Sequence, residues 1–125
     1  MNARQRRFHP TEYLDHILSA LRLAQNYVEG FSKDDFLADK KTQQAVILNI
    51  MVVGEAATQI LDEHPEFAAR HPDVPWKQIR GMRNRMAHGY FEINLDIVWD
   101  TVRTALPKLE RQILSIQQEP PESTT

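Results

Sequence analysis

Cysteine is absent from this chain of 125 residues. Without thiols the chain can form neither disulfides nor thiolate metal sites, and a catalytic cysteine is excluded. The sequence also lacks any run of about 18 apolar residues, and its N-terminal arginines precede no apolar signal segment. We therefore expect a protein that is neither secreted nor inserted in a membrane, and the missing cysteines agree with a reducing cytoplasm.

Net positive charge is lacking as well, because the formal net charge is −2. This balance argues against a protein that coats nucleic acid non-specifically. Residues 76–91 nevertheless contain no acidic residue and carry a formal +4, against −6 for the remainder of the chain. An anionic ligand would be drawn to this stretch, unless it is a solvated helix face whose counter-charges lie on neighbouring helices. Its basic residues are Lys77, Arg80, Arg83 and Arg85.

Apolar residues recur three and four positions apart in most of the chain, which predicts amphipathic helices. No segment shows clean two-residue alternation, so no strand is predicted. We expect an all-α fold, an antiparallel bundle of about four main helices, with a single domain in residues 1–118 and a disordered tail in residues 119–125. The predicted helices cover residues 10–29, 40–61, 76–88 and 95–116, with short turns at 33–37 and 67–70.

Capping residues and helix breakers sharpen these boundaries. Ser32, Asp39 and Asn94 are suited to cap the helices that follow them, and Gly30 and Gly89 to end helices in the left-handed conformation. Inside the helices, Pro107 is expected to produce a kink. Gly54 is unfavourable in an exposed helix and therefore suggests the close approach of another backbone, which would place Glu55 near the packed interior.

A polar face on the helix predicted for residues 76–88 could perform chemistry. At about 100° per residue, Arg80, Arg83, Asn84 and His88 spread over an arc of roughly 140°. Asn84 and His88 are four positions apart and can meet, whereas Arg83 and His88 are five apart and do not stack in a regular helix. Arg83 would have to reach along the helix, or the last turn would have to loosen near Gly89. Tyr90 follows and could fold back toward His88.

Such a set of side chains suits a phosphodiester. An arginine fork can bind phosphate oxygens and stabilise a pentacoordinate transition state. A histidine can remove the proton of a ribose 2′-hydroxyl or protonate the leaving oxygen. This reaction needs no metal, cleaves RNA but not DNA, and leaves a 2′,3′-cyclic phosphate. Because one histidine cannot easily be both base and acid in one step, a two-fold dimer would supply the second.

Three other interpretations of these residues stay open at this point. A histidine before a glycine at a helix end more often interacts with carbonyls or the helix dipole, and Tyr90 beside Phe91 could be half-buried packing. A metal-dependent hydrolase would have to use His64, His71 or His88 with Glu55. The first two histidines lie seven apart on a proline-broken segment, which is not a metal-ligand spacing.

The pattern Arg83-x4-His88-x-Tyr90 resembles the Arg-x4-His-x-Tyr motif of the HepT-like branch of the HEPN superfamily, the toxin half of HEPN/MNT toxin–antitoxin pairs. The resemblance extends over roughly residues 8–116. It includes Tyr13-Leu14-x2-Ile17, Val53-Gly54-Glu55-Ala56, Val74-Pro75-Trp76-x2-Ile79-x-Gly81-Met82-Arg83-Asn84, Trp99 and Leu106-Pro107-x-Leu109.

This resemblance implies a two-fold dimer in which both motif copies face one cleft. It implies a metal-independent endoribonuclease that needs no cofactor, with Arg83 and His88 as the catalytic pair. Asn84, Arg80 and Arg85 would then support substrate binding. It also implies a type VII toxin whose partner is a minimal nucleotidyltransferase antitoxin that transfers AMP from ATP to Tyr90. The alternative is a catalytically inactive module that docks a nucleotidyltransferase or a nucleotide.

Overall fold

The computed structural model describes residues 8–120, and within them every regular element is a helix. The predicted all-α class is therefore confirmed. Helix α1 (Pro10–Tyr27) is followed by the short α2 (Lys33–Leu37) and the long α3 (Lys40–Glu63). Then come α4 (Pro65–Arg70), α5 (Trp76–His88), the 3-10 turn η2 (Tyr90–Glu92), α6 (Leu95–Asp100), the π-helical turn η3 (Thr101–Ala105) and α7 (Leu106–Gln117). Of the predicted tail, residues 121–125 lie outside the described residues.

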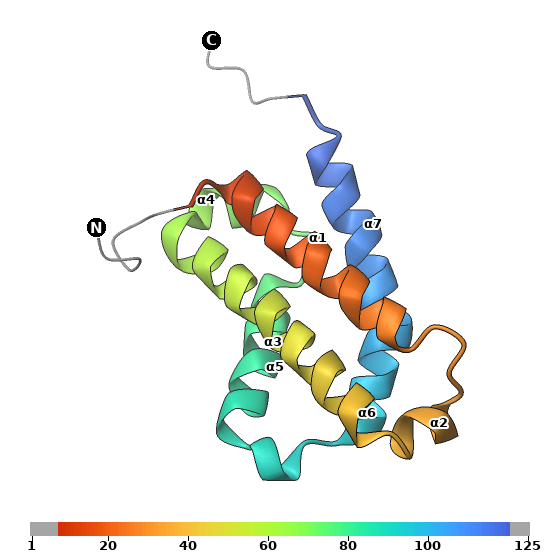
Figure 1. Cartoon of the computed structure of the whole chain (residues 1–125). Coiled ribbons are helices and arrows are strands. Elements are labelled where there is room, and N and C mark those ends of the chain that lie inside the picture. Colours follow the sequence, from red (N-terminus) through yellow and green to blue (C-terminus); the bar gives the residue numbers. More distant parts are fainter. Residues whose placement is uncertain (1–7, 121–125) are drawn as a thin grey trace.

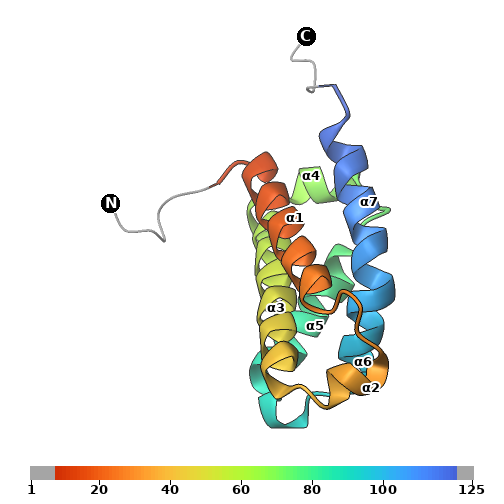
Figure 2. The same cartoon turned by 45° about the vertical axis from the view of Figure 1, so that its right-hand side comes forward.

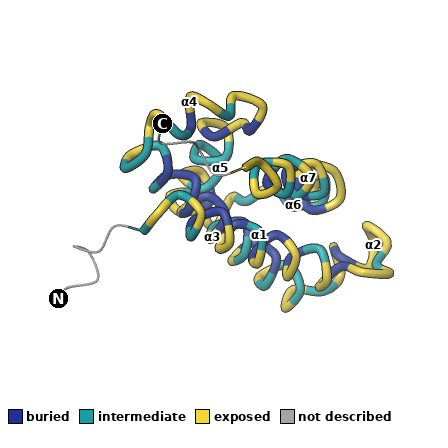
Figure 3. The backbone as a smooth tube through the Cα atoms, turned by 90° about the horizontal axis from the view of Figure 1, so that it is seen from above, coloured by how far each residue is buried: buried dark blue, intermediate teal, exposed yellow. Residues whose placement is uncertain are grey.

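Helix α3 is the centre of the bundle and contacts both α1 and α5, while α7 packs along α1 (Figures 1 and 2). Three residues of α3, Val46, Ala57 and Ile60, are completely buried. Figure 3 shows that buried backbone is concentrated where α1 and α3 face each other. By length and composition alone α3 could cross a membrane. Because 56% of its most apolar window is buried inside the bundle, it also fits the ordinary role of a core helix.

The helix boundaries follow the capping residues closely. Ser32 accepts a hydrogen bond from the Asp35 amide, Asp39 from the Thr42 amide, and Asn94 from two amides of α6. These bonds satisfy amides that have no partner within the helix. The three predicted N-caps are thus confirmed.

The two glycines that were expected to end helices behave differently. Gly30 has a positive φ of 78°, as predicted. Gly89 has a φ of −128°, so the left-handed conformation predicted there is wrong. The Gly89 amide instead donates to the Arg85 carbonyl at 2.9 Å, which continues the helical pattern by one residue. Helix α5 consequently stays regular up to His88.

The last predicted helix contains a π-helical turn just before Pro107, the residue at which the sequence predicted a kink. The turn ends at Ala105, two residues before Pro107, and α7 begins at Leu106. Proline has no amide hydrogen and its ring clashes with the carbonyl four residues earlier. A wider turn immediately before it relieves both problems.

Candidate active site

Helix α5 carries the predicted catalytic residues, and it is anchored at its start. Trp76 is only 5% exposed, and its indole Nε1 donates to the His71 carbonyl at 3.0 Å. Met86 is the other buried residue of the helix. Both anchors hold α5 against the bundle, so the backbone that carries the polar side chains has a defined position relative to α3.

Gly54 allows α3 and α5 to approach each other closely. A Cβ atom built on Gly54 would lie 2.8 Å from Cγ of Arg83 and closer still to its Cβ. Real Cβ atoms essentially never make such contacts. The close approach that the sequence predicted is confirmed, and the group that approaches Gly54 is the aliphatic stem of Arg83.

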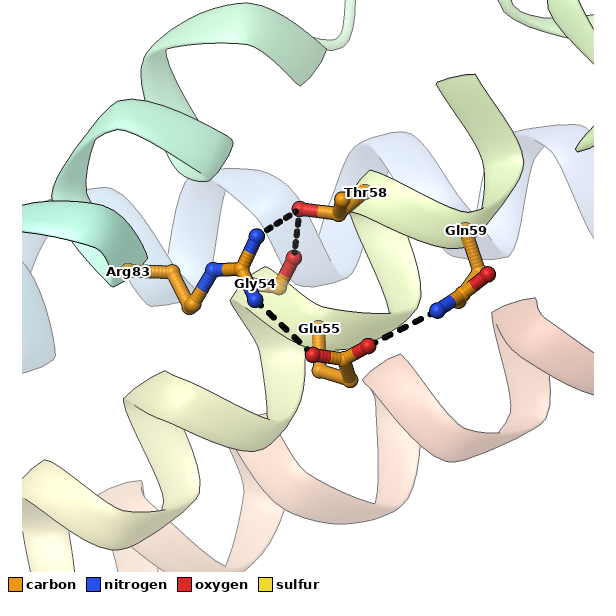
Figure 4. Close-up of polar contacts among 5 residues, drawn as sticks. All are labelled: Gly54, Glu55, Thr58, Gln59 and Arg83. Atoms are coloured by element: carbon orange, nitrogen blue, oxygen red, sulfur yellow. Dashed lines mark hydrogen bonds and ion pairs between the residues drawn. The ribbon is translucent and has the colours of Figure 1, made fainter. Parts of the chain in front are cut away.

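The guanidinium of Arg83 binds two residues of α3 (Figure 4). Its Nη1 donates to Oε1 of Glu55 at 2.9 Å, and its Nη2 donates to Oγ1 of Thr58 at 3.2 Å. The Thr58 hydroxyl donates in turn to the Gly54 carbonyl at 2.8 Å, and Gln59 Nε2 donates to the other Glu55 oxygen at 2.8 Å. We call the group Gly54, Glu55, Thr58 and Arg83 the arginine clamp.

Thr58 is the functional candidate that the sequence did not reveal. It is buried, with 7% exposure, and its hydroxyl bonds to the carbonyl four residues earlier. Threonine often makes this bond inside helices, so its position in the sequence carried no sign of a contact with another helix. Glu55, by contrast, was expected near the interior, yet its side chain is 53% exposed. That expectation was wrong, because Glu55 lies at the rim of the α3–α5 contact.

The remaining hydrogen-bonding capacity of Arg83 is limited. A guanidinium has five N–H groups, of which Glu55 and Thr58 accept one each. The Nε atom is buried and has no hydrogen-bond partner. One N–H on each terminal nitrogen is left for a ligand, and the 23% exposure of the side chain shows that part of it reaches solvent.

His88 lies exposed at the C-terminal end of α5, together with Asn84 and Arg85. Within residues 8–120 the side chains of these three residues form no hydrogen bond or ion pair, so Asn84 and His88 do not bind each other here. Because α5 is regular, Arg83 and His88 are displaced by about 7.5 Å along its axis. The structure therefore places the two on one helix without bringing them into contact.

The basic stretch is partly neutralised by α3. Arg80 Nη1 lies 3.7 Å from Oδ1 of Asp62, and Arg83 pairs with Glu55. Acidic residues of the neighbouring helix α3 thus pair with two of the four basic residues in this stretch. Among the described residues, Lys77 and Arg85 have no ion-pair partner. Two cationic side chains of α5 remain available to an anion.

Tyr90 and Phe91 form a short turn beyond His88. Tyr90 is 49% exposed, so it is half-buried as the packing alternative expects, whereas Phe91 is fully exposed. Their rings touch edge to face, with centroids 6.1 Å apart. The Tyr90 phenol has no hydrogen-bond partner in the part of the chain that the structure describes. It is chemically accessible.

Two of the three histidines of the metal-site alternative, His64 and His71, have other partners. Nε2 of His64 lies 2.8 Å from the Phe8 carbonyl, and the His71 ring contacts Phe67 in a tilted arrangement with centroids 4.7 Å apart. Residues 8–120 contain no group of three or more His, Asp or Glu side chains that could hold a metal ion. Nothing in the described chain therefore favours that alternative.

Comparison of the sequence with known proteins finds one family of ribonucleases. The profile of a family described as Ribonuclease HepT-like matches residues 17–116. A candidate RNase of Caldanaerobacter subterraneus subsp. tengcongensis is 37% identical over 87% of this chain and 95% of its own. A probable ribonuclease HepT of Thermococcus cleftensis is 35% identical over 79% of this chain and 87% of its own. A candidate RNase of Methanocaldococcus jannaschii is 36% identical over 83% and 84%, respectively. No solved structure is significantly similar to the chain.

Proposed function

This chain belongs to the HepT-like ribonuclease family of the HEPN superfamily, and we propose that it cleaves RNA without a metal ion, using Arg83 and His88. The observation that carries the proposal is the contrast between these two side chains. Arg83 is held by hydrogen bonds to α3, whereas the His88 ring is exposed and unbonded on the same helix. A fixed cation can bind a phosphate, and an unbonded imidazole can exchange a proton.

The reaction follows from these properties. His88 removes the proton of a ribose 2′-hydroxyl, and the 2′-oxygen attacks the adjacent phosphorus. The two free N–H groups of Arg83 bind the phosphate oxygens, where negative charge increases in the transition state. The bond to the 5′-oxygen breaks, that oxygen gains a proton, and a 2′,3′-cyclic phosphate remains. Lys77 and Arg85, which lack acidic partners, would attract the RNA backbone.

A second copy of the chain would complete the site. Leu48 and Val52 are 61% and 39% exposed on α3. They lie within about 60° of Glu55 around the helix, so an exposed apolar stripe leads directly to the arginine clamp. Exposed apolar surface of this kind marks protein contacts. We propose that two copies pack through this stripe, bringing two His88 rings to one cleft, one as base and one as acid.

Tyr90 is proposed as the site of regulation within a type VII toxin–antitoxin pair. The phenol is exposed two residues beyond His88. Its oxygen can attack the α-phosphate of ATP held by a minimal nucleotidyltransferase, with release of pyrophosphate. The attached adenylate adds negative charge and bulk beside a basic cleft, which would exclude RNA.

The test uses the purified full chain with structured and single-stranded RNA in EDTA. We expect cleavage to 2′,3′-cyclic phosphate ends, loss of cleavage in His88→Ala, a strongly reduced but measurable rate in Arg83→Ala, and normal cleavage in His16→Ala, an exposed histidine of α1. A requirement for added magnesium would contradict the mechanism. Absence of cleavage together with tight binding of the neighbouring nucleotidyltransferase by wild type and His88→Ala alike would favour the inactive docking module.

A further inference from the structure

We propose that Glu55 and Thr58 are positioning residues that hold the Arg83 guanidinium in the orientation needed for the RNA phosphate. The inference rests on the proposed ribonuclease activity and assigns roles on α3, outside the Arg-x4-His-x-Tyr pattern. The two residues would act through Arg83 and would not themselves touch the reacting atoms. The directions of the hydrogen bonds in the arginine clamp support this role.

The Thr58 hydroxyl has a single hydrogen, and it is committed to the Gly54 carbonyl at 2.8 Å. The oxygen lone pairs of Thr58 therefore face Arg83, whose Nη2 donates to them at 3.2 Å. Since Thr58 is only 7% exposed, this acceptor is fixed by the core of α3. The position of one terminal nitrogen of Arg83 is thus set by a rigid helix.

Glu55 sets the other terminal nitrogen. Its Oε1 accepts from Nη1 of Arg83 at 2.9 Å, and its Oε2 accepts from Gln59 at 2.8 Å. The carboxylate is held on both sides, although it is 53% exposed. With one acceptor on each terminal nitrogen, the guanidinium plane cannot rotate freely. The two remaining N–H groups then point in defined directions.

Close packing completes the arrangement. The stem of Arg83 lies against Gly54, and Nε is buried without a partner. A free surface arginine has many rotamers, and ordering it on RNA binding would oppose catalysis. An arginine that is already ordered does not lose this conformational entropy when RNA binds. Small errors in its position would, however, slow the reaction.

Stability alone does not explain the clamp. Exposed ion pairs contribute little to folding, and Glu55 is half exposed. Variants of a positioning residue should lose activity through Arg83 while the protein stays folded. A merely structural contact would instead change the melting temperature and leave the chemistry of the folded fraction intact.

The decisive experiment is a double-mutant cycle on kcat/KM for RNA cleavage. Thr58→Val keeps the shape of the side chain and removes the acceptor, and we expect a loss of about 10- to 100-fold. Thr58→Ser keeps the hydroxyl and should retain activity. In an Arg83→Ala background, Thr58→Val should cause no further loss, because the group it positions is gone. An equal loss in both backgrounds would overturn the proposal.

Glu55→Gln should likewise lower kcat/KM in the presence of Arg83 only. The matched control is Glu110→Gln, which removes an ion pair with Arg22 of similar length, 2.8 Å, between α1 and α7. That variant should cleave RNA normally. Faster cleavage by Glu55→Gln would mean that Glu55 restrains Arg83 instead of positioning it, and would refute its assigned role.

Failure of the positioning role can be distinguished from failure of the proposed ribonuclease function. If wild type does not cleave RNA in EDTA, the proposed function is wrong, and the clamp is judged by binding. The probe is a 2′-O-methyl RNA oligonucleotide, which lacks the nucleophile. Weaker binding by Thr58→Val than by wild type, with no difference in the Arg83→Ala background, would support positioning of Arg83. Equal affinity of wild type and Thr58→Val would overturn it.

Discussion

Gly54 and Arg83 lie in such close contact that the arginine stem occupies the place of the missing Gly54 side chain. A Cβ on Gly54 would be 2.8 Å from Arg83 Cγ, far inside ordinary van der Waals distance. The absence of a Cβ at Gly54 allows α5 to approach α3 closely at this point. It also determines whether the guanidinium can reach Glu55 and Thr58.

Gly54→Ala should destabilise the protein by about 1–3 kcal/mol, the usual cost of overpacking, and should lower RNA cleavage because Arg83 is displaced. The control is Gly81→Ala on α5, whose new Cβ would be 3.5 Å from Arg85 Nη1, an ordinary contact. It should stabilise the helix by about 0.5–1 kcal/mol. Urea denaturation measures the free energy of unfolding of both variants. If Gly54→Ala left it unchanged, the close contact with Arg83 would be contradicted.

Leu48→Glu should convert the proposed dimer to a monomer, because it places a charge in the apolar stripe of α3. RNA cleavage should decrease in the same variant, because each proposed site needs His88 from both copies. Sedimentation or light scattering measures the mass, and Leu23→Glu is the control, a 42% exposed leucine of α1. If Leu23→Glu dissociates the dimer while Leu48→Glu does not, the interface lies on α1.

Tyr90→Phe should prevent adenylylation. Incubation of the wild-type chain with ATP and its proposed partner, a minimal nucleotidyltransferase, should add one adenylate, detected by intact-mass spectrometry, and should stop RNA cleavage. The variant should stay unmodified and remain active under the same conditions. Tyr27→Phe, which alters a tyrosine of α1 that is 40% exposed, should be modified like wild type. Adenylylation of Tyr90→Phe would place the site elsewhere.

Acid should weaken the contact between α1 and α7. The hydrogen bond from Arg22 Nε holds the pKa of the Glu110 carboxyl below its ordinary value, while partial burial opposes that shift. A lowered folded-state pKa adds stability above the unfolded pKa, and this stability is lost as pH falls through the folded pKa. The free energy of unfolding of wild type should exceed that of Glu110→Gln at about pH 6, and the difference should shrink toward about pH 3. If the difference in the free energy of unfolding between the two proteins did not change with pH, the lowered pKa of Glu110 would be contradicted.

Much of the fold was predictable because its determinants are local. Apolar spacing and the N-caps Ser32, Asp39 and Asn94 predicted most helix boundaries to within two or three residues. The backbone of Gly89, which was misjudged, and the π-helical turn before Pro107, which was not predicted, depend on how a helix end or a wide turn is accommodated by its surroundings. Sequence spacing does not contain that information.

For the candidate site, the sequence by itself determined that an arginine and a histidine share one helix and suggested that another segment closely approaches Gly54. Only the tertiary structure decided that this segment is α5, with the stem of Arg83 against Gly54, and that Arg83 is bound by Glu55 and Thr58. The physical reason is distance along the chain. Arg83 and Thr58 are 25 residues apart, so no helical period relates them, and their hydrogen bond exists only because α3 and α5 pack closely at Gly54.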